Sequence, residues 1–244
     1  MLLTEFDANR QAIINPEALH EPLEGFPKIA VSCFSRLTFQ RMLEMFPHEL
    51  IYETSMANVA IPIYKLVIDD NELAIFNAPV GASACVGILE DIFVLGADKL
   101  VLFGTCGVLD EDIKETSIII PSHALRDEGT SFHYVEASDE IAVNVGVLDH
   151  FRSYLNERQI SHKEGKVWTT DGVYRETNGK LKARKAAGAI CVDMECSAVA
   201  ALAKFRCVDI CHFFYAADHL SEGNWDARNS VSYTHLTLPT TSRV

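Results

Sequence analysis

Short apolar runs alternate with segments of helical spacing along most of this chain. Continuous apolar runs of this length are typical of buried strands, and a strand–helix alternation predicts one mostly parallel sheet with helices on both faces. The expected strands are Lys28–Ser32, Ile61–Ile68, Glu72–Phe76, Lys99–Phe103, Thr116–Pro121 and Lys166–Thr170. The expected helices are Arg36–Phe46, Gly81 to about Leu95, one near Val143–Arg158 and one near Thr177–Lys185.

The remaining segments predict turns, loops and the domain limits. Asp69-Asp70-Asn71 is expected to be a hairpin turn, residues 1–26 irregular, and Ser122–Asp139 a long loop of the kind that serves a site. With no repeat or linker, we expect a single domain over residues 1–230. Residues 231–244 end in a Pro-Thr-Thr-Ser stretch and resemble translated cloning sequence, with a frayed native tail as the alternative.

Composition narrows the classes of function. The 244 residues carry a formal charge of −13, which argues against nucleic acid and anionic membranes as partners but not against a small neutral substrate. We expect no signal peptide in the first residues, which carry acidic side chains and no long apolar run, and no segment offers the roughly 20 apolar residues needed to span a bilayer. Seven cysteines without a disulfide framework indicate a reducing compartment, so we expect a cytoplasmic protein.

Two strand ends in the last quarter of the chain each deliver a carboxylate. Cys191–Ala198 is expected to be a short strand that runs directly into a helix of small residues, with Glu195 at the junction. Phe214–His219 is expected to be an apolar strand with Asp218 at its carboxyl end. Ligands collect at the carboxyl ends of strands in α/β sheets, so the pair predicts a site. Taken singly, each carboxylate could simply cap a helix or a turn.

The segment Gly104-Thr105-Cys106-Gly107 follows an expected buried strand. We expect it to be a tight turn whose N–H groups and hydroxyl could hold an oxyanion. The alternative is that the two glycines serve the turn sterically.

Four cysteines near the carboxyl end invite comparison with a zinc site. Cys191, Cys196, Cys207 and Cys211, with His212, lack the two-residue spacing of zinc knuckles. We expect buried thiols there and no metal. The chain also has no Gly-x-Ser-x-Gly nucleophile motif and no Gly-x-Gly-x-x-Gly dinucleotide motif.

Taken together and in order, four motifs resemble the nucleoside phosphorylase family, which includes purine nucleoside phosphorylases, uridine phosphorylases and related nucleosidases. The motifs are Leu102–Gly107, Arg126–Tyr134, Val192-Asp193-Met194-Glu195 and Ala217-Asp218. The resemblance runs from about Lys28 to Arg228. It implies a three-layer α/β/α fold and cleavage of an N-ribosidic bond. The attacking group is phosphate in the phosphorylases and water in the nucleosidases, and we expect inorganic phosphate as co-substrate with no cofactor. The resemblance also implies a homo-oligomer in which a neighbouring subunit completes each site.

The resemblance assigns roles to residues of the expected base and sugar site. It implies that Glu195 holds the ribose hydroxyls, that Met194 packs on the sugar, and that Asp193 belongs to the same substrate-binding motif. Asp218 matches the acid that purine-cleaving members present to the base. Tyr174, in Thr169–Tyr174, matches an aromatic position against the base.

For phosphate, the resemblance points to Gly104, Thr105 and Cys106, and to Arg36 from the first strand–helix loop. That loop reads Ser-Cys-Phe-Ser-Arg where the family has Gly-Asp-Pro-x-Arg. Phosphorolytic members also carry an arginine where this chain has Leu102, and no arginine lies between positions 41 and 126. Lys65 is a candidate substitute.

These residues favour a purine nucleoside phosphorylase, because uridine-cleaving members lack the aspartate and use a Gln-x-Arg pair that is absent near Tyr174. The missing cations leave a nucleosidase open, because water needs no anion clamp. A uridine-type enzyme and a catalytically silent nucleoside-binding protein are the remaining alternatives.

Overall fold

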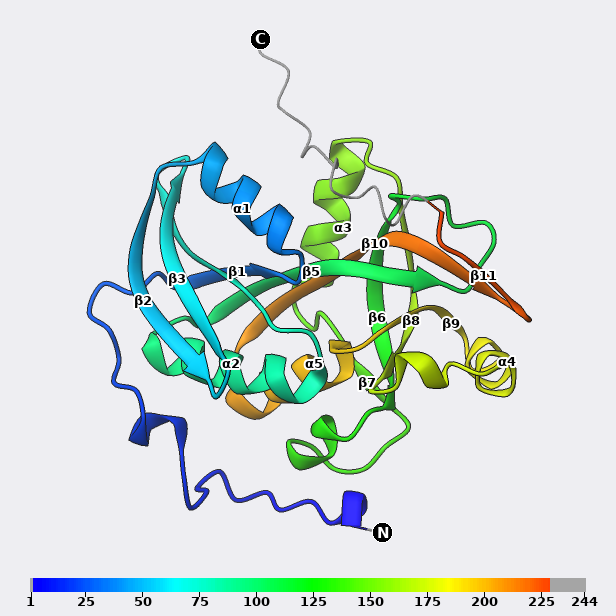
Figure 1. The fold of residues 1–244 in the computed structure, drawn as a ribbon, viewed down its shortest axis with the longest axis horizontal. Coiled ribbons are helices and arrows are strands. Elements are labelled where there is room, and N and C mark those ends of the chain that lie inside the picture. The colour runs from blue at the N-terminus through cyan, green and yellow to red at the C-terminus, as the bar shows by residue number, and fades with distance from the viewer. Residues whose placement is uncertain (1, 229–244) are drawn as a thin grey trace.

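The computed structural model describes residues 2–228, in which eleven strands form one sheet with five α-helices around it (Figure 1). The strands are β1 Ile29–Cys33, β2 His48–Met56, β3 Val59–Ile68, β4 Asn71–Asn77, β5 Lys99–Val108, β6 Ile118–Asp127, β7 Glu140–Ala142, β8 His162–Thr170, β9 Ala189–Asp193, β10 Asp209–Ser221 and β11 Asn224–Asp226. The α-helices are α1 Arg36–Met45, α2 Ala82–Leu95, α3 Leu148–Glu157, α4 Asn178–Ala186 and α5 Cys196–Arg206. Four 3₁₀ turns are η1 Leu2–Thr4, η2 Pro16–Ala18, η3 Thr130–His133 and η4 Val173–Arg175.

The helices cover the sheet on two sides, which confirms the three-layer α/β prediction. In Figure 1, α1 and α3 lie over one face, and α2 and α5 lie together beneath the other. Helix α5 is buried from Cys196 to Ala203, and its alanines let the backbone approach the sheet and α2 closely. This packing fixes the start of α5, where Glu195 lies.

The sheet is mixed, with parallel pairs at its centre, and part of it closes on itself. Strand β5 pairs in parallel with β1 and β10, and antiparallel with β9. Strand β10 also pairs with β6, β6 pairs with β8, and β8 pairs with β9. Because β9 pairs back with β5, these five strands form a closed ring. Closure places the end of β9 and the second half of β10 on either side of β5.

The predicted hairpin at residues 61–76 is confirmed. Ile68 pairs with Asn71, so Asp69 and Asp70 form a two-residue loop, with φ of 49° and 62°. Two successive positive φ values are the signature of a type I′ turn, and aspartate tolerates this conformation better than most residues.

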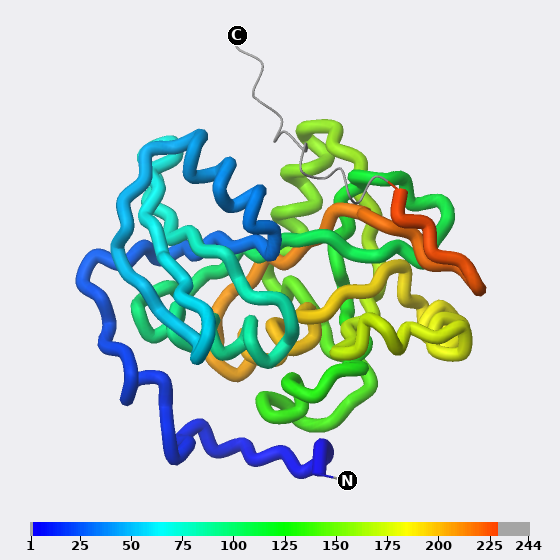
Figure 2. Tube along the Cα trace, in the orientation of Figure 1, coloured from blue at the N-terminus to red at the C-terminus, as the bar shows by residue number. Residues whose placement is uncertain are grey.

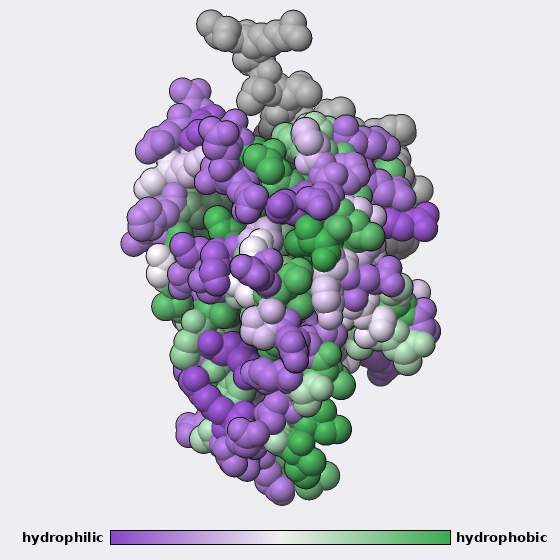
Figure 3. Space-filling view, turned by 90° about the vertical axis from the view of Figure 1, so that its left-hand side faces the viewer, coloured by the Kyte–Doolittle hydropathy of each residue, from purple (hydrophilic) through white to green (hydrophobic). Residues whose placement is uncertain are grey.

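Strand β2 is missing from the sequence prediction. Within residues 2–228 it is an edge strand that pairs with β3 alone, and most of its side chains are partly or fully exposed. Its residues therefore lack the continuous apolar run that identifies a buried strand. Figure 3 shows this side of the molecule as a mixed surface, with apolar side chains scattered among polar ones.

Two predicted segments near the middle of the chain are wrong in extent. The loop expected from Ser122 begins only after Asp127, because β6 continues through these residues and pairs with β7 and β8. The helix expected from Val143 begins at Leu148, because Asn144 and Gly146 have positive φ. Asn144 also accepts from the N–H of His212 and donates to the carbonyl groups of Pro121 and His212, which fixes a turn.

Two further strand limits differ from the prediction. Strand β6 begins at Ile118 instead of Thr116, because Thr116 has a φ of 65°, which lies outside the β region of regular strands. Strand β8 begins at His162, four residues before the predicted Lys166, and this polar extension pairs with β6.

Residues 2–26 are irregular apart from η1 and η2, as predicted, and run along the outside of the molecule (Figure 2). The single-domain assignment over residues 1–230 stays a prediction. The tail predicted at residues 231–244 lies outside the described residues.

Candidate functional site

The β9–α5 junction forms as predicted, and Asp193 holds it together. Its Oδ2 accepts hydrogen bonds from the N–H groups of Glu195 (2.9 Å) and Cys196 (2.7 Å), and its Oδ1 accepts from Thr169 Oγ1 (2.7 Å). Burial raises the pKa of Asp193 to about 6, although these three donors oppose the shift. Both oxygens are thus occupied in positioning the junction, and a contact between Asp193 and substrate stays a prediction.

Glu195 is the N-cap residue of α5, and its side chain is 5 % exposed. Its Oε1 accepts a hydrogen bond of 2.6 Å from the N–H of Gly81, the residue that precedes α2. Burial raises the pKa of Glu195 to about 8, and the charge of Asp193 adds to the effect. The carboxyl group therefore takes up a proton, or a hydrogen bond from a ligand, more readily than an exposed glutamate.

A cavity of about 730 Å³ is lined by Met194 and by Gly81, the residue whose N–H donates to Glu195. It lies between the start of α2 and the segment that contains η3. Its lining residues are Gly81, Ala82, Ser83, Val86, Gly87, Gly129, Thr130, His133, Tyr134, Asp171 and Met194. Met194 therefore lies on the cavity wall, whereas Glu195 does not line the cavity and is hydrogen-bonded to the wall residue Gly81.

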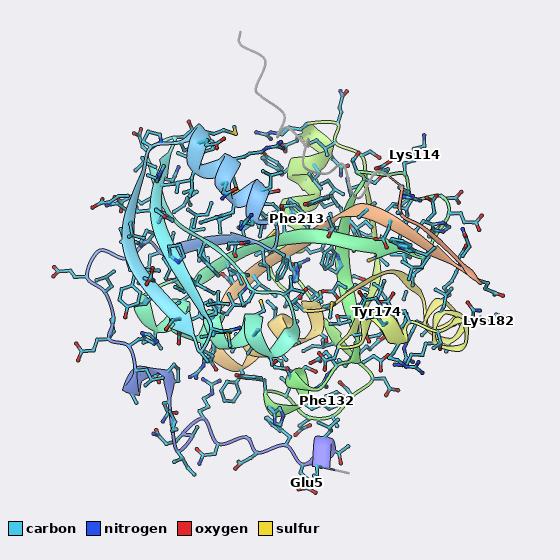
Figure 4. All side chains as sticks on the ribbon, in the orientation of Figure 1. Glu5, Lys114, Phe132, Tyr174, Lys182 and Phe213 are labelled. Carbon is cyan, nitrogen blue, oxygen red and sulfur yellow. The ribbon has the colours of Figure 1, made fainter. Side chains whose placement is uncertain are left out.

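Buried polar groups fix the segment that forms the far wall. Arg126 donates to Ser131 Oγ, to the carbonyl of Glu136 and to Ser138 Oγ, and its guanidinium lies 4.1 Å from the centre of the Phe132 ring. Figure 4 shows Phe132 in this segment, below the sheet.

Glu128 ties the same segment to α5. Its Oε1 accepts from Ser197 Oγ (2.8 Å), and its Oε2 accepts from the N–H of Ser131 (2.9 Å). The cavity wall and the Glu195 junction are therefore parts of one buried hydrogen-bonded network.

The predicted turn Gly104–Gly107 is wrong, because these residues lie within β5. Its glycines serve close packing: a Cβ on Gly104 would lie 2.7 Å from Phe34 Cδ2, and one on Gly107 would lie 2.6 Å from Leu220 Cδ1. Cys106 is buried, whereas Thr105 is exposed.

Arg36 lies near the same edge of the sheet as Thr105. It is the first residue of α1, three positions after Cys33, and Cys33 pairs with Phe103 on β5. Arg36 is exposed, and among residues 2–228 it has no hydrogen-bond or ion-pair partner. The predicted phosphate residues are thus brought to one end of β1 and β5.

Asp218 lies within β10 instead of at its end, at a break in the pairing with β5 between Ala216 and His219. The irregularity separates Asp218 from the regular ladder. Its Oδ2 accepts a hydrogen bond of 2.7 Å from Trp225 Nε1, and its Oδ1 lies 3.4 Å from the point where a Cβ on Gly107 would be. Gly107 pairs on its other side with Val192 of β9.

The ring of strands thus brings Asp218 and the Met194–Glu195 junction to the two sides of one segment of β5. The loop at residues 171–177 lies near both carboxylates: the charge of Asp171 acts on Glu195, and the charge of Asp218 acts on Glu176. Asp218 does not line the cavity that Met194 lines. Tyr174, which belongs to this loop and is labelled in Figure 4, is 95 % exposed.

Leu102 and Lys65 are the two positions that the sequence analysis considered for a second phosphate-binding cation. Leu102 is completely buried, so its position offers nothing to an anion. Lys65 lies on β3 and forms ion pairs with Glu49 and Glu72. These ion pairs give no support to the hypothesis that Lys65 replaces the missing arginine within one chain.

Sequence reasoning missed several residues of the site. Gly81, Glu128, Glu176 and Trp225 contact or act on the predicted residues, yet none belongs to a motif assigned a role. The sequence offered a signal for two of them: Glu128 lies within the quoted motif Arg126–Tyr134, and Glu176 lies two residues after Tyr174.

The cysteines do not form a metal site. Residues 2–228 contain no group of three or more His, Cys, Asp or Glu side chains arranged to hold a metal ion. All seven cysteines are free. Cys191 and Cys196 are buried as predicted, whereas Cys211 is only half-buried and Cys207 is exposed, because Cys207 follows α5 at a surface turn with φ of 60°. Within this part of the chain, no helix is long and apolar enough to span a bilayer.

Known proteins resemble this chain in sequence. A guanosine phosphorylase from Halorubrum lacusprofundi is 23% identical over 144 residues, which cover 58% of this chain and 60% of that protein. A DeoD-type purine nucleoside phosphorylase from Brevibacillus brevis is 28% identical over 129 residues, covering 52% and 55%. The match therefore spans less than two thirds of the length of these relatives.

Solved structures share the fold. A uridine phosphorylase from Vibrio fischeri ES114 superposes with a TM-score of 0.73 at 18% identity, covering 85% of this chain and 86% of its own. A purine nucleoside phosphorylase from Toxoplasma gondii, in complex with immucillin-H, has the same TM-score and identity and covers 86% and 87%. The family model of the phosphorylase superfamily matches residues 28–234, most of the chain, and the protein therefore belongs to that superfamily.

Proposed function

We propose that this protein is a nucleoside phosphorylase that cleaves a purine nucleoside with phosphate, giving free base and ribose 1-phosphate. The observation that carries the proposal is the Met194–Glu195 junction, where a buried carboxyl group lies behind a cavity and Asp218 lies across β5. Family membership and the phosphorylase relatives support the same reaction.

Glu195 has the surroundings that the sugar requires. Breaking a ribosidic bond develops positive charge on the ribose, and a carboxylate bonded to its hydroxyl groups stabilises that charge. Burial and the charge of Asp193 raise the pKa of Glu195 to about 8, and ribose hydroxyls that donate to it would favour its ionised form. Met194 on the cavity wall would pack against the sugar.

Asp218 supports a purine as the leaving group. An acidic group beside the base can supply a proton or a hydrogen bond to the departing nitrogen, a contribution of about 10²–10⁴ in rate. Trp225 fixes the orientation of Asp218, and the exposed ring of Tyr174 is available to stack on a base that occupies the region.

Phosphate would bind at the end of β1 and β5, between the Thr105 hydroxyl and the Arg36 guanidinium, with the N–H groups of Gly104 and Cys106 nearby. No cofactor is required, because phosphate itself is the nucleophile. We propose a cytoplasmic homo-oligomer in which a second copy supplies a further cation near Thr105.

The experiment compares Glu195→Ala and Asp218→Asn with the wild-type protein on inosine, guanosine and uridine in phosphate buffer. We expect Glu195→Ala to abolish release of every base, and Asp218→Asn to lower purine release by about 10²-fold or more. Uridine cleavage that is unchanged by Asp218→Asn would indicate a uridine-type enzyme instead.

A nucleosidase is the second candidate, and buried Leu102 favours it because one expected phosphate cation is absent. Release of base at full rate in phosphate-free buffer would support this reading. Tight nucleoside binding without base release in either buffer would instead identify a silent nucleoside-binding protein and contradict both enzymatic proposals.

A further inference from the structure

Tyr134 lies in the wall between two cavities. It lines the cavity of about 730 Å³ that Met194 also lines, and it lines a second cavity of about 680 Å³. The second cavity lies between the N-terminal segment, which contributes Phe6 and Arg10, and the chain that follows η3 together with the end of α5. The position of the Tyr134 ring therefore affects the shape of the cavity beside Met194.

Two helices hold the Tyr134 side chain. Its ring packs against Phe205 of α5, with ring centres 5.5 Å apart and an interplanar angle of 81°, the edge-to-face geometry that aromatic pairs favour. Burial raises the pKa of Tyr134, and the charge of Glu90 on α2 and a hydrogen bond to it add to the rise. With its hydroxyl group bonded to Glu90, Tyr134 offers its ring to the cavity.

Arg206 ties these two supports together. Its Nε donates a hydrogen bond of 2.6 Å to Glu90 Oε2, and its guanidinium lies 5.4 Å from the centre of the Phe205 ring. Glu90, Phe205 and Arg206 thus form one connected group behind Tyr134.

The N-terminal segment covers this group from the outside. The guanidinium of Arg10 lies 5.7 Å from the Phe205 ring centre, within the range of a cation–π contact, and its Nη2 donates to Cys207 Sγ (3.4 Å). Turn η1 also contacts η3, and Figure 4 shows Glu5 of this segment below Phe132 of η3. Figure 2 shows the same chain passing beneath the loop that contains η3.

A separate anchor fixes the segment farther along the chain. His20 Nε2 lies 3.2 Å from Asp91 Oδ1 on α2, and its Nδ1 lies 3.1 Å from the Tyr52 hydroxyl oxygen on β2. These contacts do not involve Arg10. Loss of the Arg10 side chain should therefore release the part of the segment that covers Phe205 and leave the rest in place.

We propose that Tyr134 is a positioning residue for the nucleoside, and that Arg10 holds its ring in the cavity wall through Phe205. This inference rests on the proposed function, because the nucleoside must occupy the cavity beside Met194. The ring supplies an apolar surface for the nucleoside to pack on, away from the bond that breaks. Loosening the ring should therefore weaken binding and leave the chemical step close to its wild-type rate.

The first test measures kcat and KM for inosine in phosphate buffer. We expect Tyr134→Ala to raise KM about 10-fold or more while kcat changes less than about 2-fold. Tyr134→Phe keeps the ring and should rescue KM to within about 2-fold of wild type. Arg10→Ala removes one cation–π contact and should raise KM by about 2–5-fold. A fall in kcat without a rise in KM, or an unchanged KM in Tyr134→Ala, would overturn the proposal.

Arg158→Ala is the matched control for Arg10→Ala. The Arg158 guanidinium lies 3.8 Å from the centre of the Tyr154 ring at the end of α3, on the opposite face of the sheet. This variant loses the same kind of contact far from Tyr134, so KM should stay at the wild-type value. An equal rise in KM in both arginine variants would show a general loosening and would overturn the proposal.

The second test needs no activity. Hydrogen exchange followed by mass spectrometry reports on residues 128–138, which contain η3 and Tyr134. We expect Arg10→Ala to speed exchange in this segment by about 2–5-fold, and Arg158→Ala to leave it unchanged. Unchanged exchange in Arg10→Ala would contradict the role of Arg10.

The two tests separate this inference from the proposed function. If Arg10→Ala speeds exchange but the wild-type protein neither binds nor cleaves a nucleoside, the hold on Tyr134 exists and the proposed function is what fails. If the wild-type protein cleaves inosine and Arg10→Ala changes neither KM nor exchange, the proposed function stands and this inference fails.

Discussion

Glu195 and His212 are both buried ionisable residues, and burial acts on them in opposite directions. Burial and the charge of Asp193 raise the pKa of Glu195 to about 8, whereas burial lowers the pKa of His212 to about 3. Both side chains are therefore neutral in the folded, unliganded protein over a range where they are charged in the unfolded chain. Each such mismatch costs stability, and the pH at which the cost appears identifies the residue.

Glu195 should lower the free energy of unfolding as the pH rises. Between pH 4.5 and 8 the unfolded chain has lost this proton while the folded protein keeps it, so the free energy of unfolding falls with pH. Glu195→Gln removes the effect, and we expect the Tm difference between variant and wild type to grow by roughly 7–14 °C from pH 5 to pH 8, about 3.5 kcal/mol. Thermal melts at the two pH values measure it, and a difference that stays constant would contradict the assigned pKa.

His212 should behave in the opposite way. Neither ring nitrogen has a hydrogen-bond partner among residues 2–228, and its ring centre lies 4.7 Å from that of Phe214. We expect His212→Phe to raise stability by about 1 kcal/mol at pH 7, because a buried polar ring without partners is replaced by an apolar one. The gain should increase toward pH 5, where the unfolded histidine binds a proton. A loss of stability at both pH values would show that the ring has polar partners.

For single residues, the sequence predicts which side chains belong to the site better than it predicts their hydrogen-bond partners. The motifs identify Glu195 and Asp218 as site carboxylates, and the structure brings both beside β5. Their hydrogen-bond donors, Gly81 and Trp225, could not be predicted, because Gly81 lies 114 positions from Glu195 and Trp225 belongs to a hairpin with no sequence signal.

Strand β5 shows why the two glycines of Gly104–Gly107 led to a wrong prediction of a turn. Gly104 and Gly107 suggest a turn, but they lie in a strand and make room for Phe34 and Leu220. Local sequence cannot distinguish a glycine that supplies an unusual φ from one that admits a neighbouring side chain, because the second reason depends on the packed structure. The predicted β9–α5 junction succeeded because its apolar run and small-residue helix are local patterns.

Gly104→Ala tests this explanation of β5. The added Cβ would lie 2.7 Å from Phe34 Cδ2, so we expect a loss of about 1–3 kcal/mol in the free energy of unfolding. Gly179→Ala is the matched control: this glycine lies in α4 with no atom within 4 Å of the added Cβ, so alanine should be neutral or stabilise by up to about 1 kcal/mol. Urea titrations compare the two, and equal effects would refute the packing role of Gly104.

The other misread elements have the same origin. Strand β2 escapes prediction because an exposed edge needs no apolar run, and β6 extends into the predicted loop because β7 and β8 pair with it. Elements specified by neighbouring residues were found, and those specified by distant pairing partners were not.

For the whole molecule, the arrangement of strands was predictable only in outline. Alternating strands and helices indicate a three-layer α/β fold, but not that β10 pairs with both β5 and β6 and so closes a ring. This closure places Asp218 across β5 from the Met194–Glu195 junction, although the two lie on separate strands. The site is therefore a property of the complete sheet.

The central claim, transfer of a ribosyl group from a purine to phosphate, is tested most directly by ³¹P NMR. The protein is incubated with inosine or guanosine in phosphate buffer, and a parallel sample contains no phosphate. We predict that a ribose 1-phosphate resonance grows in step with free base, and that base release stops without phosphate. Base release at the same rate without phosphate, with free ribose as the product, would contradict the account.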